Sequence, residues 1–329
     1  MSGGESVKVE IKKSHIAQGV ALTSIILIMP ALRPEFAWLY FLVPLPSFYL
    51  TTIMGRKGSG ITIGLAIVLS SLIAGLFGDI SVMLFALGLL PAGFSLAHSL
   101  RVGETPHRAG LRAVLTALLF WAALWALIAF DLGTNPYQES VKTLDQSITS
   151  WYELYVKSAP PQAERTKEIE IAVTQLRNLT PKIFPALMLV SVCITIWLNM
   201  LIGHWLLSKS QTDHTPWPNY RNWELPDHLV WGVVLGITGL IIPGDIPHVF
   251  ALNLLIVLGT LFFFQGLAVL SHLLNRWRFP GLLRSIIYLI FFLQVFGIVI
   301  LSIMGLLDTW LDIRRRKPKE NDNADQAVF

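Results

Sequence analysis

Residues 249–274 read VFALNLLIVLGTLFFFQGLAVLSHLL, a stretch of twenty-six positions without a charged side chain. About 20 helical residues span the roughly 30 Å hydrocarbon core of a bilayer, so this stretch is long enough to cross a membrane. A backbone in lipid must satisfy its hydrogen bonds within its own segment, which predicts a helix. The stretch is the centre of an apolar last third that runs from Trp223 to Arg316.

The composition of the whole chain indicates the same class of protein. Of its 329 residues, 53% are hydrophobic and only 14% are charged, whereas soluble domains average about 25% charged residues. The formal net charge of +4 is typical of the Lys and Arg bias of cytoplasmic loops, which we favour over nucleic-acid binding. The single cysteine, Cys193, excludes an intramolecular disulfide and cysteine-based metal clusters.

The predicted fold is all-α, a polytopic membrane helix bundle of eight or nine transmembrane helices with an extracytoplasmic two-helix insertion. Pro44 and Pro46 predict a kink in the second span. One segment, Leu229–Ile242, is short for a crossing and is either a span or a re-entrant half helix. The predicted spans are Ile16–Leu32, Phe36–Met54, Gly60–Phe77, Ile80–Leu100, Gly110–Phe130, Ile183–Leu207, Leu229–Ile242, Val249–Leu274 and Ser285–Leu307.

The insertion covers residues 132–182. Apolar residues recur at helical spacing on both sides of Pro160-Pro161, which predicts two amphipathic helices. A helical hairpin that lies against the bundle or the lipid headgroups is the simpler interpretation, and a gating lid or partner-docking element is the alternative. The two apolar sets are Val141, Leu144, Ile148, Trp151 and Tyr155, and then Ile169, Val173, Leu176 and Leu179.

The rest of the chain divides around this insertion. Residues 1–15 are predicted to be a cytoplasmic N-terminal segment, and residues 16–131 an N-terminal membrane region of five helices. Residues 183–312 are predicted to form a C-terminal membrane bundle, and residues 313–329 a polar, disordered tail.

Lys and Arg in short loops set the orientation, because cytoplasmic loops are enriched in both. With a cytoplasmic N-terminus, the inner loops hold nearly all of these cations, and Arg33 alone lies in an outer short loop. The cationic tail conflicts with nine crossings, which would place Arg314 and its basic neighbours outside. The conflict disappears if Leu229–Ile242 does not cross, so the sequence leaves eight and nine crossings open.

Polar side chains inside apolar helices point to function, because burying them costs free energy unless they are paired. The candidate substrate-binding residues are Asn253 and Gln265 in the eighth span and Gln294 in the ninth. Asp245 and His248, at a hairpin end, are close enough to share a proton or a cation. The alternatives are interhelical hydrogen bonds, worth about 0.6 kcal/mol on average, and ordinary turn chemistry for Asp245. Polar or small residues all round the eighth span predict that it is the central helix.

Asp308 and Asp312 are an i,i+4 pair of carboxylates at the end of the last span. Such a pair repels unless a cation lies nearby, and Arg315 or Arg316 is the candidate. A structural clasp between these charges is favoured over catalysis.

No catalytic residue, metal site or cofactor is predicted, and the chain is not expected to be an enzyme. The run Gly55–Gly60 lacks the spacing of a phosphate-binding loop. Ser95 with His98 is a poor basis for a serine protease, which also needs oxyanion donors. The only Glu-x-x-His spacing, at Glu104 and His107, contains Pro106 and has no second pair.

Four stretches, taken in order, resemble the bacterial DUF2232 family, also called the YybS-like membrane proteins. They are Gly55–Gly58, Trp223–Asp227, the pair Asn253–Leu258 and Gln265–Val269, and Gly305–Arg314. The resemblance implies a multi-pass protein of the bacterial inner membrane. It also implies a distant similarity to the substrate-binding subunits of energy-coupling-factor vitamin transporters. The long insertion and the extra spans depart from the six-helix pattern of those subunits.

Three functions are compatible with these observations. The first is a transport-related protein that binds a small-molecule solute in the C-terminal bundle and uses an ATPase partner supplied in trans. The second is a non-catalytic scaffold or interaction protein of the cell envelope, which binds other membrane proteins. The third, a membrane enzyme, lacks a nucleophile or a metal set. The expected surroundings are the lipid bilayer and partner proteins, with no nucleic acid.

Overall fold

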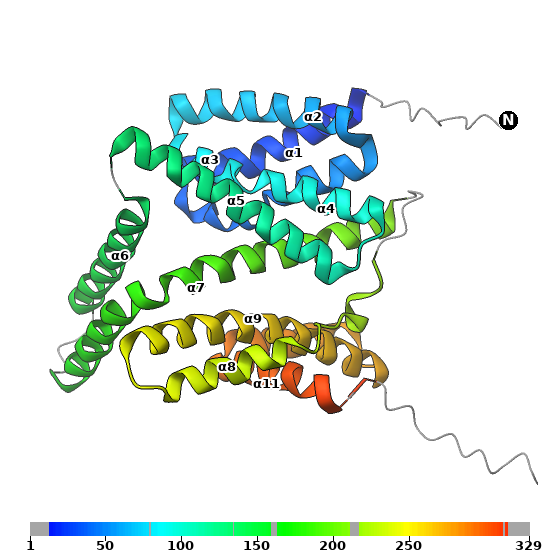
Figure 1. Cartoon of the computed structure of the whole chain (residues 1–329). Coiled ribbons are helices and arrows are strands. Elements are labelled where there is room, and N and C mark those ends of the chain that lie inside the picture. Colours follow the sequence, from blue (N-terminus) through cyan, green and yellow to red (C-terminus); the bar gives the residue numbers. More distant parts are fainter. Residues whose placement is uncertain are drawn as a thin grey trace, which may run out of the picture. The chain divides into compact units, whose positions relative to one another are not determined.

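The computed structural model describes residues 13–78, 80–133, 135–158, 163–210, 217–311 and 313–314. All regular elements in these residues are helices, which confirms the all-α prediction (Figure 1). The chain forms two compact units, Met1–Trp217 and Pro218–Phe329. The segment Ile183–Leu207, which the sequence grouped with the C-terminal bundle, belongs to the first of these units.

The first unit contains seven α-helices and a 3₁₀ helix among its described residues. They are α1 (Lys13–Leu32), η1 (Pro34–Leu42), α2 (Pro44–Phe77), α3 (Ile80–Leu87), α4 (Leu90–Val102), α5 (Pro106–Leu132), α6 (Pro136–Ser158) and α7 (Ala163–Lys209). The described residues of the second unit form η2 (Tyr220–Asn222), α8 (Leu229–Ile241), α9 (Asp245–Arg276), α10 (Gly281–Leu293) and α11 (Val295–Leu311).

Fewer helices are long enough to span a membrane than the sequence predicted. In the described part of the chain four segments qualify by length and composition, or five if the bent pair α10–α11 counts as one span. The helical stretch of Ile16–Leu32 and helix α8 are apolar but shorter. The predicted eight or nine crossings are therefore not confirmed. The four segments are Pro34–Phe77, Pro106–Phe130, Lys167–Lys209 and Asp245–Arg276.

Part of the difference between the predicted and the observed number of spans arises in α2, which joins two predicted spans into one broken helix. Gly55 has φ 75° and ψ 173°, a backbone conformation that glycine adopts without strain. Across this break Thr51 Oγ1 donates to Ser59 Oγ at 2.9 Å, whereas residues eight apart in a straight helix lie about 12 Å apart. The chain therefore turns sharply at Gly55. Pro44 begins α2, where a proline has no hydrogen bond to lose, and the 3₁₀ helix η1 ends at Leu42 just before it. The predicted kink at Pro44 and Pro46 stays a prediction.

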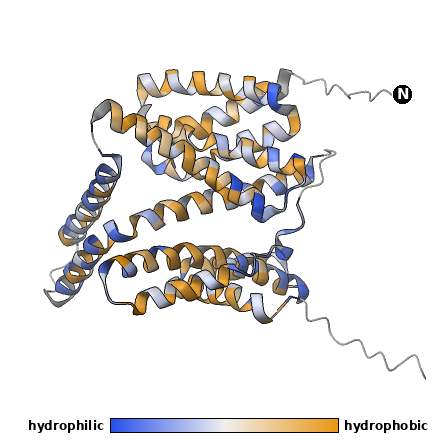
Figure 2. Cartoon of the chain, viewed as in Figure 1, coloured by the Kyte–Doolittle hydropathy of each residue, from blue (hydrophilic) through white to orange (hydrophobic). Residues whose placement is uncertain are grey.

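The insertion folds as α6 followed by the first part of α7, which continues without interruption into the predicted span Ile183–Leu207. Hydrophilic colour gathers on α6 and the beginning of α7, whereas α5, α8 and α9 are mostly hydrophobic (Figure 2). Pro185 has no N–H to offer the carbonyl of Pro181, and the Tyr137 hydroxyl donates to that carbonyl instead, at 2.9 Å. The extracytoplasmic position of this hairpin stays a prediction.

Helix α9 is the central helix of the second unit, as its sequence predicted. In its most apolar 18-residue window 56% of the residues are buried, against 11% in α5. Helix α8 packs on one side, where a Cβ at Gly236 would meet the Leu255 side chain. Helix α11 packs on another side so closely that a Cβ at Gly266 would collide with the backbone of Leu301. Small residues thus let the helices approach each other.

Helices α9 and α11 run in the same direction. Ser302 Oγ donates to the Gly259 carbonyl at 3.0 Å, and Gln265 Nε2 donates to Asp308 Oδ2 at 3.2 Å, each pair being 43 residues apart. The chain must therefore return between the two helices, and it does so through α10. The predicted single span Ser285–Leu307 is instead broken at Gln294, with a bend of 105°.

This break removes the conflict over the cationic C-terminal end. Because α9 and α11 are parallel, their C-terminal ends lie at the same end of the second unit, and Arg276 and Arg314 lie there together. Arg314 and Arg221 both act electrostatically on His272 of α9, as Arg276 does. Arg276 at the end of α9 and Arg314 just after α11 therefore need not lie on opposite sides of a membrane.

Candidate functional site

A buried polar cluster lies where three segments of the second unit meet. We call Gln265, Asp308 and Arg314 the polar cluster. Gln265 lies on α9, Asp308 lies on α11, and Arg314 follows the end of α11. The third segment, the link before α8, contributes backbone groups. Gln265 is 2% exposed and Asp308 is 4% exposed. The side chain of Arg314 is 6% exposed, so both charges of this ion pair are shielded from water.

Arg314 uses four of its five N–H donors in hydrogen bonds. Nε and Nη2 donate to Asp308 Oδ2 at 3.1 and 2.6 Å. Nη1 donates to the carbonyls of Arg221 and Trp223 at 3.2 and 2.9 Å, and Nη2 also lies 3.6 Å from Glu224 Oε1. Carbonyls in an irregular link have no helical donor, and the planar guanidinium satisfies two of them while it pairs with a carboxylate.

Gln265 joins the link to the ion pair. Its Oε1 accepts a hydrogen bond from the Leu225 N–H at 3.4 Å, and its Nε2 donates to Asp308 Oδ2. The Tyr220 hydroxyl donates to the Phe264 carbonyl beside it. The link 218–227 is therefore held against α9 by side chains at both of these points, and its conformation depends on the polar cluster.

One oxygen of the cluster has no partner among the described residues. Within that part of the chain Asp308 Oδ1 is buried and accepts no hydrogen bond, and the neighbouring Thr309 Oγ1 is also buried without a partner. A buried acceptor that finds no donor loses its hydration without compensation, so an oxygen of this kind requires an explanation. A water molecule or the donor group of a small solute would satisfy it.

The sequence-predicted site residues are not gathered in one place. Asn253 is half-buried on α9 and donates to the Val249 carbonyl at 2.7 Å. It lies about 18 Å along the helix from Gln265. Gln294 is exposed at the break between α10 and α11. Asp245, which begins α9, and His248 are neighbours, but about 30 Å of helix separates Asp245 from Gln265. Of the five residues only Gln265 is in the polar cluster, and ligand binding by the others stays a prediction.

The described residues show an ion pair of Asp308 with a third arginine, Arg314. The sequence suggested Arg315 or Arg316 as the cation for Asp308 and Asp312, and all of these except Asp308 lie outside the described residues. The part of the clasp that involves them stays a prediction. Sequence reasoning missed the ion pair with Arg314 because α11 ends at Leu311, so no helical spacing relates Arg314 to Asp308. The signal in the sequence that could have indicated this ion pair was a lone aspartate late in an apolar span, followed within a few residues by arginines.

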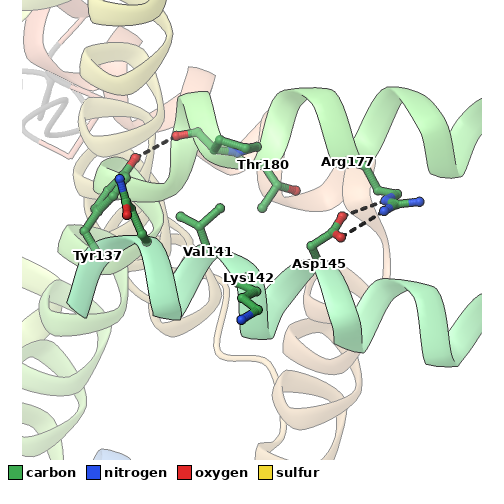
Figure 3. Close-up of a pocket in the computed structure, with 8 residues that line it drawn as sticks. Tyr137, Val141, Lys142, Asp145, Arg177 and Thr180 are labelled. Carbon is green, nitrogen blue, oxygen red and sulfur yellow. Dashed lines mark hydrogen bonds and ion pairs between the residues drawn. The ribbon is translucent and has the colours of Figure 1, made fainter. Parts of the chain in front are cut away.

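A second candidate lies on the hairpin of α6 and α7. A groove of about 260 Å³ runs between these helices, and the Asp145–Arg177 ion pair lies at one end of it (Figure 3). Arg177 donates to both oxygens of Asp145, at 2.6 and 2.9 Å. These hydrogen bonds lower the pKa of Asp145 below its ordinary value. The groove is lined by Tyr137, Gln138, Val141, Lys142, Asp145, Arg177, Thr180 and Pro181.

Residues 21–309 match the model of the family described as "Predicted membrane protein (DUF2232)". The chain belongs to this family. A relative in Bacillus subtilis (strain 168), described as "Uncharacterized protein YybS", is 24% identical over 283 residues, which cover 84% of this chain and 89% of the relative. No solved structure matches the chain. The expected family is thus confirmed, and the protein is a membrane protein with several apolar helices.

Three of the four stretches that carried the family resemblance meet at the polar cluster. Trp223–Asp227 supplies the link, Gln265–Val269 supplies Gln265 and Gly266, and Gly305–Arg314 supplies Asp308 and Arg314. The close contact of α9 with α11 belongs to the same place, because a Cβ at Gly305 would collide with the Phe262 backbone. The fourth stretch, Gly55–Gly58, forms the sharp turn of α2 in the first unit.

Proposed function

We propose that this DUF2232 protein is transport-related and binds a small polar solute in its second unit, at the polar cluster, with no catalysis of its own. We place it in the bacterial inner membrane with a cytoplasmic N-terminus. The observation that carries the proposal is the buried Oδ1 of Asp308, which has no partner among the residues that the structure describes. Ionisable groups buried in membrane bundles are costly to keep and commonly line solute or ion pathways.

The chemistry of the cluster defines the class of solute. Four of the five N–H donors of Arg314 make hydrogen bonds, and its Nη2 also faces the carboxylate of Glu224, so the guanidinium is poorly placed to receive an anionic solute. The open position is the acceptor Oδ1 of Asp308. The solute would therefore present a hydrogen-bond donor, such as an ammonium, hydroxyl or amide N–H group, and would be neutral or cationic.

The helix break at Gln294, about 20 Å along α11 from Asp308, supports the same function. Helix α10 ends at Leu293 and α11 begins two residues later with a bend of 105°. Discontinuous helices of this kind form substrate sites in many transporters, because broken backbone can line a cavity in the membrane. The break lies on the helix that carries Asp308, so a movement at Gln294 would reach the cluster through α11.

A direct test combines native mass spectrometry with thermal unfolding. The purified protein is expected to retain a small molecule, and adding that molecule back is expected to raise the unfolding temperature. Asp308→Asn should abolish this rise. The amide NH₂ would take the position of Oδ1 and present a hydrogen-bond donor where the solute's donor needs an acceptor. Thr238→Val should leave the rise intact, because Thr238 is exposed on α8 and donates to the Val234 carbonyl of its own helix. A rise that persists in Asp308→Asn would refute the site, and protein that retains no small molecule would favour a purely structural cluster.

A second function, that of an interaction protein of the cell envelope, is favoured by exposed apolar residues on α6. Trp151 is 58% exposed and Leu154 is 67% exposed, on a helix that is not among the candidate spans. Exposed apolar groups of this size are common at protein interfaces. A photo-crosslinking amino acid at Leu154 should capture a partner in cells, whereas one at the exposed, polar Gln146 of the same helix should capture less. Equal capture at both positions would count against this function.

A further inference from the structure

The turn that follows α9 presents two arginines and a tryptophan to the surroundings of the second unit. Arg276, Trp277 and Arg278 are all exposed, and the Trp277 side chain is 61% exposed. Trp277 contacts the Phe279 ring edge-on, with the ring centroids 6.1 Å apart. Tryptophan between cations is typical of the bilayer interface, where the ring is in the headgroup region and the charges face phosphate.

Arg278 keeps its side chain in a backbone conformation that favours glycine. Its φ is 54°, and it is the only non-glycine residue with positive φ among those described. It follows the end of α9, where Phe279 N–H donates to the Leu274 carbonyl and Arg278 N–H to the Asn275 carbonyl, both at 3.1 Å. Helices commonly end in this hydrogen-bond pattern, with glycine at the left-handed position. Glycine would relieve the steric cost of a Cβ there, so the arginine is not explained by the turn itself.

Among the described residues, the charges around this turn leave its two arginines available. The acids of this region in that part of the chain are Asp308 and Glu224, which both face Arg314, and the exposed Asp227 on the link. Arg284 donates to the Phe279 carbonyl at 2.7 Å and so supports the turn. The side of a membrane protein with exposed arginines in short loops is normally cytoplasmic, and the cytoplasmic leaflet carries the anionic lipids.

We propose that the turn 276–280 binds the headgroup of an anionic phospholipid. Arg276 and Arg278 donate to the phosphate oxygens, and the Trp277 ring lies beside them at the headgroup level. Guanidinium groups suit this ligand because they donate to phosphate in pairs. The site is separate from the solute site proposed above and does not depend on it, because it uses none of the polar-cluster side chains.

The test uses the full chain in nanodiscs made of equal parts phosphatidylcholine and phosphatidylglycerol. Native mass spectrometry then identifies the lipids that stay bound when the disc is removed. Wild-type protein is expected to retain phosphatidylglycerol in preference to phosphatidylcholine. Arg278→Gly should lose most of this preference, yet its unfolding temperature should be unchanged or higher, because glycine relieves the left-handed conformation. If Arg278 had only a structural role, Arg278→Gly would not lose the lipid preference while it kept its unfolding temperature.

Two further arms make the result decisive. Lys142→Gln removes one exposed positive charge from α6 and should retain phosphatidylglycerol like wild type, so equal loss in this variant would overturn the proposal in favour of general charge attraction. Excess inorganic phosphate should not displace the lipid, and displacement would assign the site to free phosphate. Unaltered lipid preference in Arg278→Gly would also overturn the proposal.

Discussion

Two arginine–aspartate pairs with the same closest distance occupy opposite environments in this protein. Arg314 and Asp308 approach to 2.6 Å with side chains that are 6% and 4% exposed. Arg177 and Asp145 also approach to 2.6 Å, but their side chains are 46% and 40% exposed. The distance between the charges therefore says little about what each pair contributes, and burial with the surrounding hydrogen bonds decides it.

The physical reason is the reference state of each charge. Water and salt screen the pair on the hairpin, so either partner is nearly as well solvated when it is alone. The buried pair has lost its hydration, and Gln265 together with two link carbonyls replaces that water. Removing one partner there leaves an uncompensated charge, at a typical cost of about 3–5 kcal/mol.

The buried pair depends on α9 and α11 running in the same direction, and cysteine labelling tests this with an all-or-none result. In a Cys193→Ser background, Asn275→Cys and Leu311→Cys should be modified by a membrane-impermeant reagent from the same side of the membrane. Pro243→Cys, at the other end of α9, should be modified from the opposite side. Modification of Asn275→Cys and Leu311→Cys from different sides would contradict the parallel arrangement.

Arg314→Met should produce the largest loss of stability, about 3–5 kcal/mol, because it leaves Asp308 buried and unpaired. The double variant Asp308→Leu with Arg314→Met should recover part of that loss, because it removes both charges. Denaturant unfolding followed by tryptophan fluorescence measures both variants. If the double variant is as unstable as the single one, the link carbonyls rather than the carboxylate give Arg314 its importance.

The contact between α9 and α11 that brings Gln265 to Asp308 can be broken at a glycine. Gly266→Ala should cost about 1–3 kcal/mol, because its Cβ would collide with the Leu301 backbone. Gly259→Ala is the matched control on the same helix: its Cβ would meet no atom within 4 Å, and alanine is the better helix former by about 1 kcal/mol. A similar loss in both variants would argue against close packing at Gly266.

The smallest effect is expected for the exposed pair. Asp145→Asn should barely change the global unfolding temperature, and high salt should remove the difference that remains. Since Arg177 lowers the pKa of Asp145, the pair stabilises the hairpin above the unfolded-state pKa and is lost as pH falls through the folded-state pKa. The protection of α6 amides against hydrogen exchange, relative to their intrinsic rates, should therefore fall slightly in wild type as pH falls, whereas Asp145→Asn should lack this fall. An equal fall of protection in wild type and variant would contradict the role of the pair.

The sequence predicted the elements whose evidence is periodic and missed those that depend on packing. The uncharged run 249–274 predicted α9, and its glycines and polar residues on every face predicted a central helix. The break at Gln294 left no signal, because Ser285–Leu307 is apolar on both sides of it, and Gln294 was interpreted as a ligand instead. The residues between the predicted spans Phe36–Met54 and Gly60–Phe77 do contain a turn, at Gly55.

The candidate site was only partly predictable for a similar reason. Gln265 was identified because a lone amide in an apolar helix is conspicuous. Its partners were not, because Leu225 offers a backbone N–H and Arg314 lies beyond the end of α11. Only the folded chain shows that these groups meet.

A double-mutant cycle on each of the two pairs tests most directly whether burial decides their contributions. For Asp308→Asn with Arg314→Gln, the coupling free energy between the two substitutions is expected to exceed about 1.5 kcal/mol, because the hydrogen bonds are charged and shielded from water. For Asp145→Asn with Arg177→Gln, the coupling is expected to be indistinguishable from zero. Equal coupling energies in the two cycles would contradict the account.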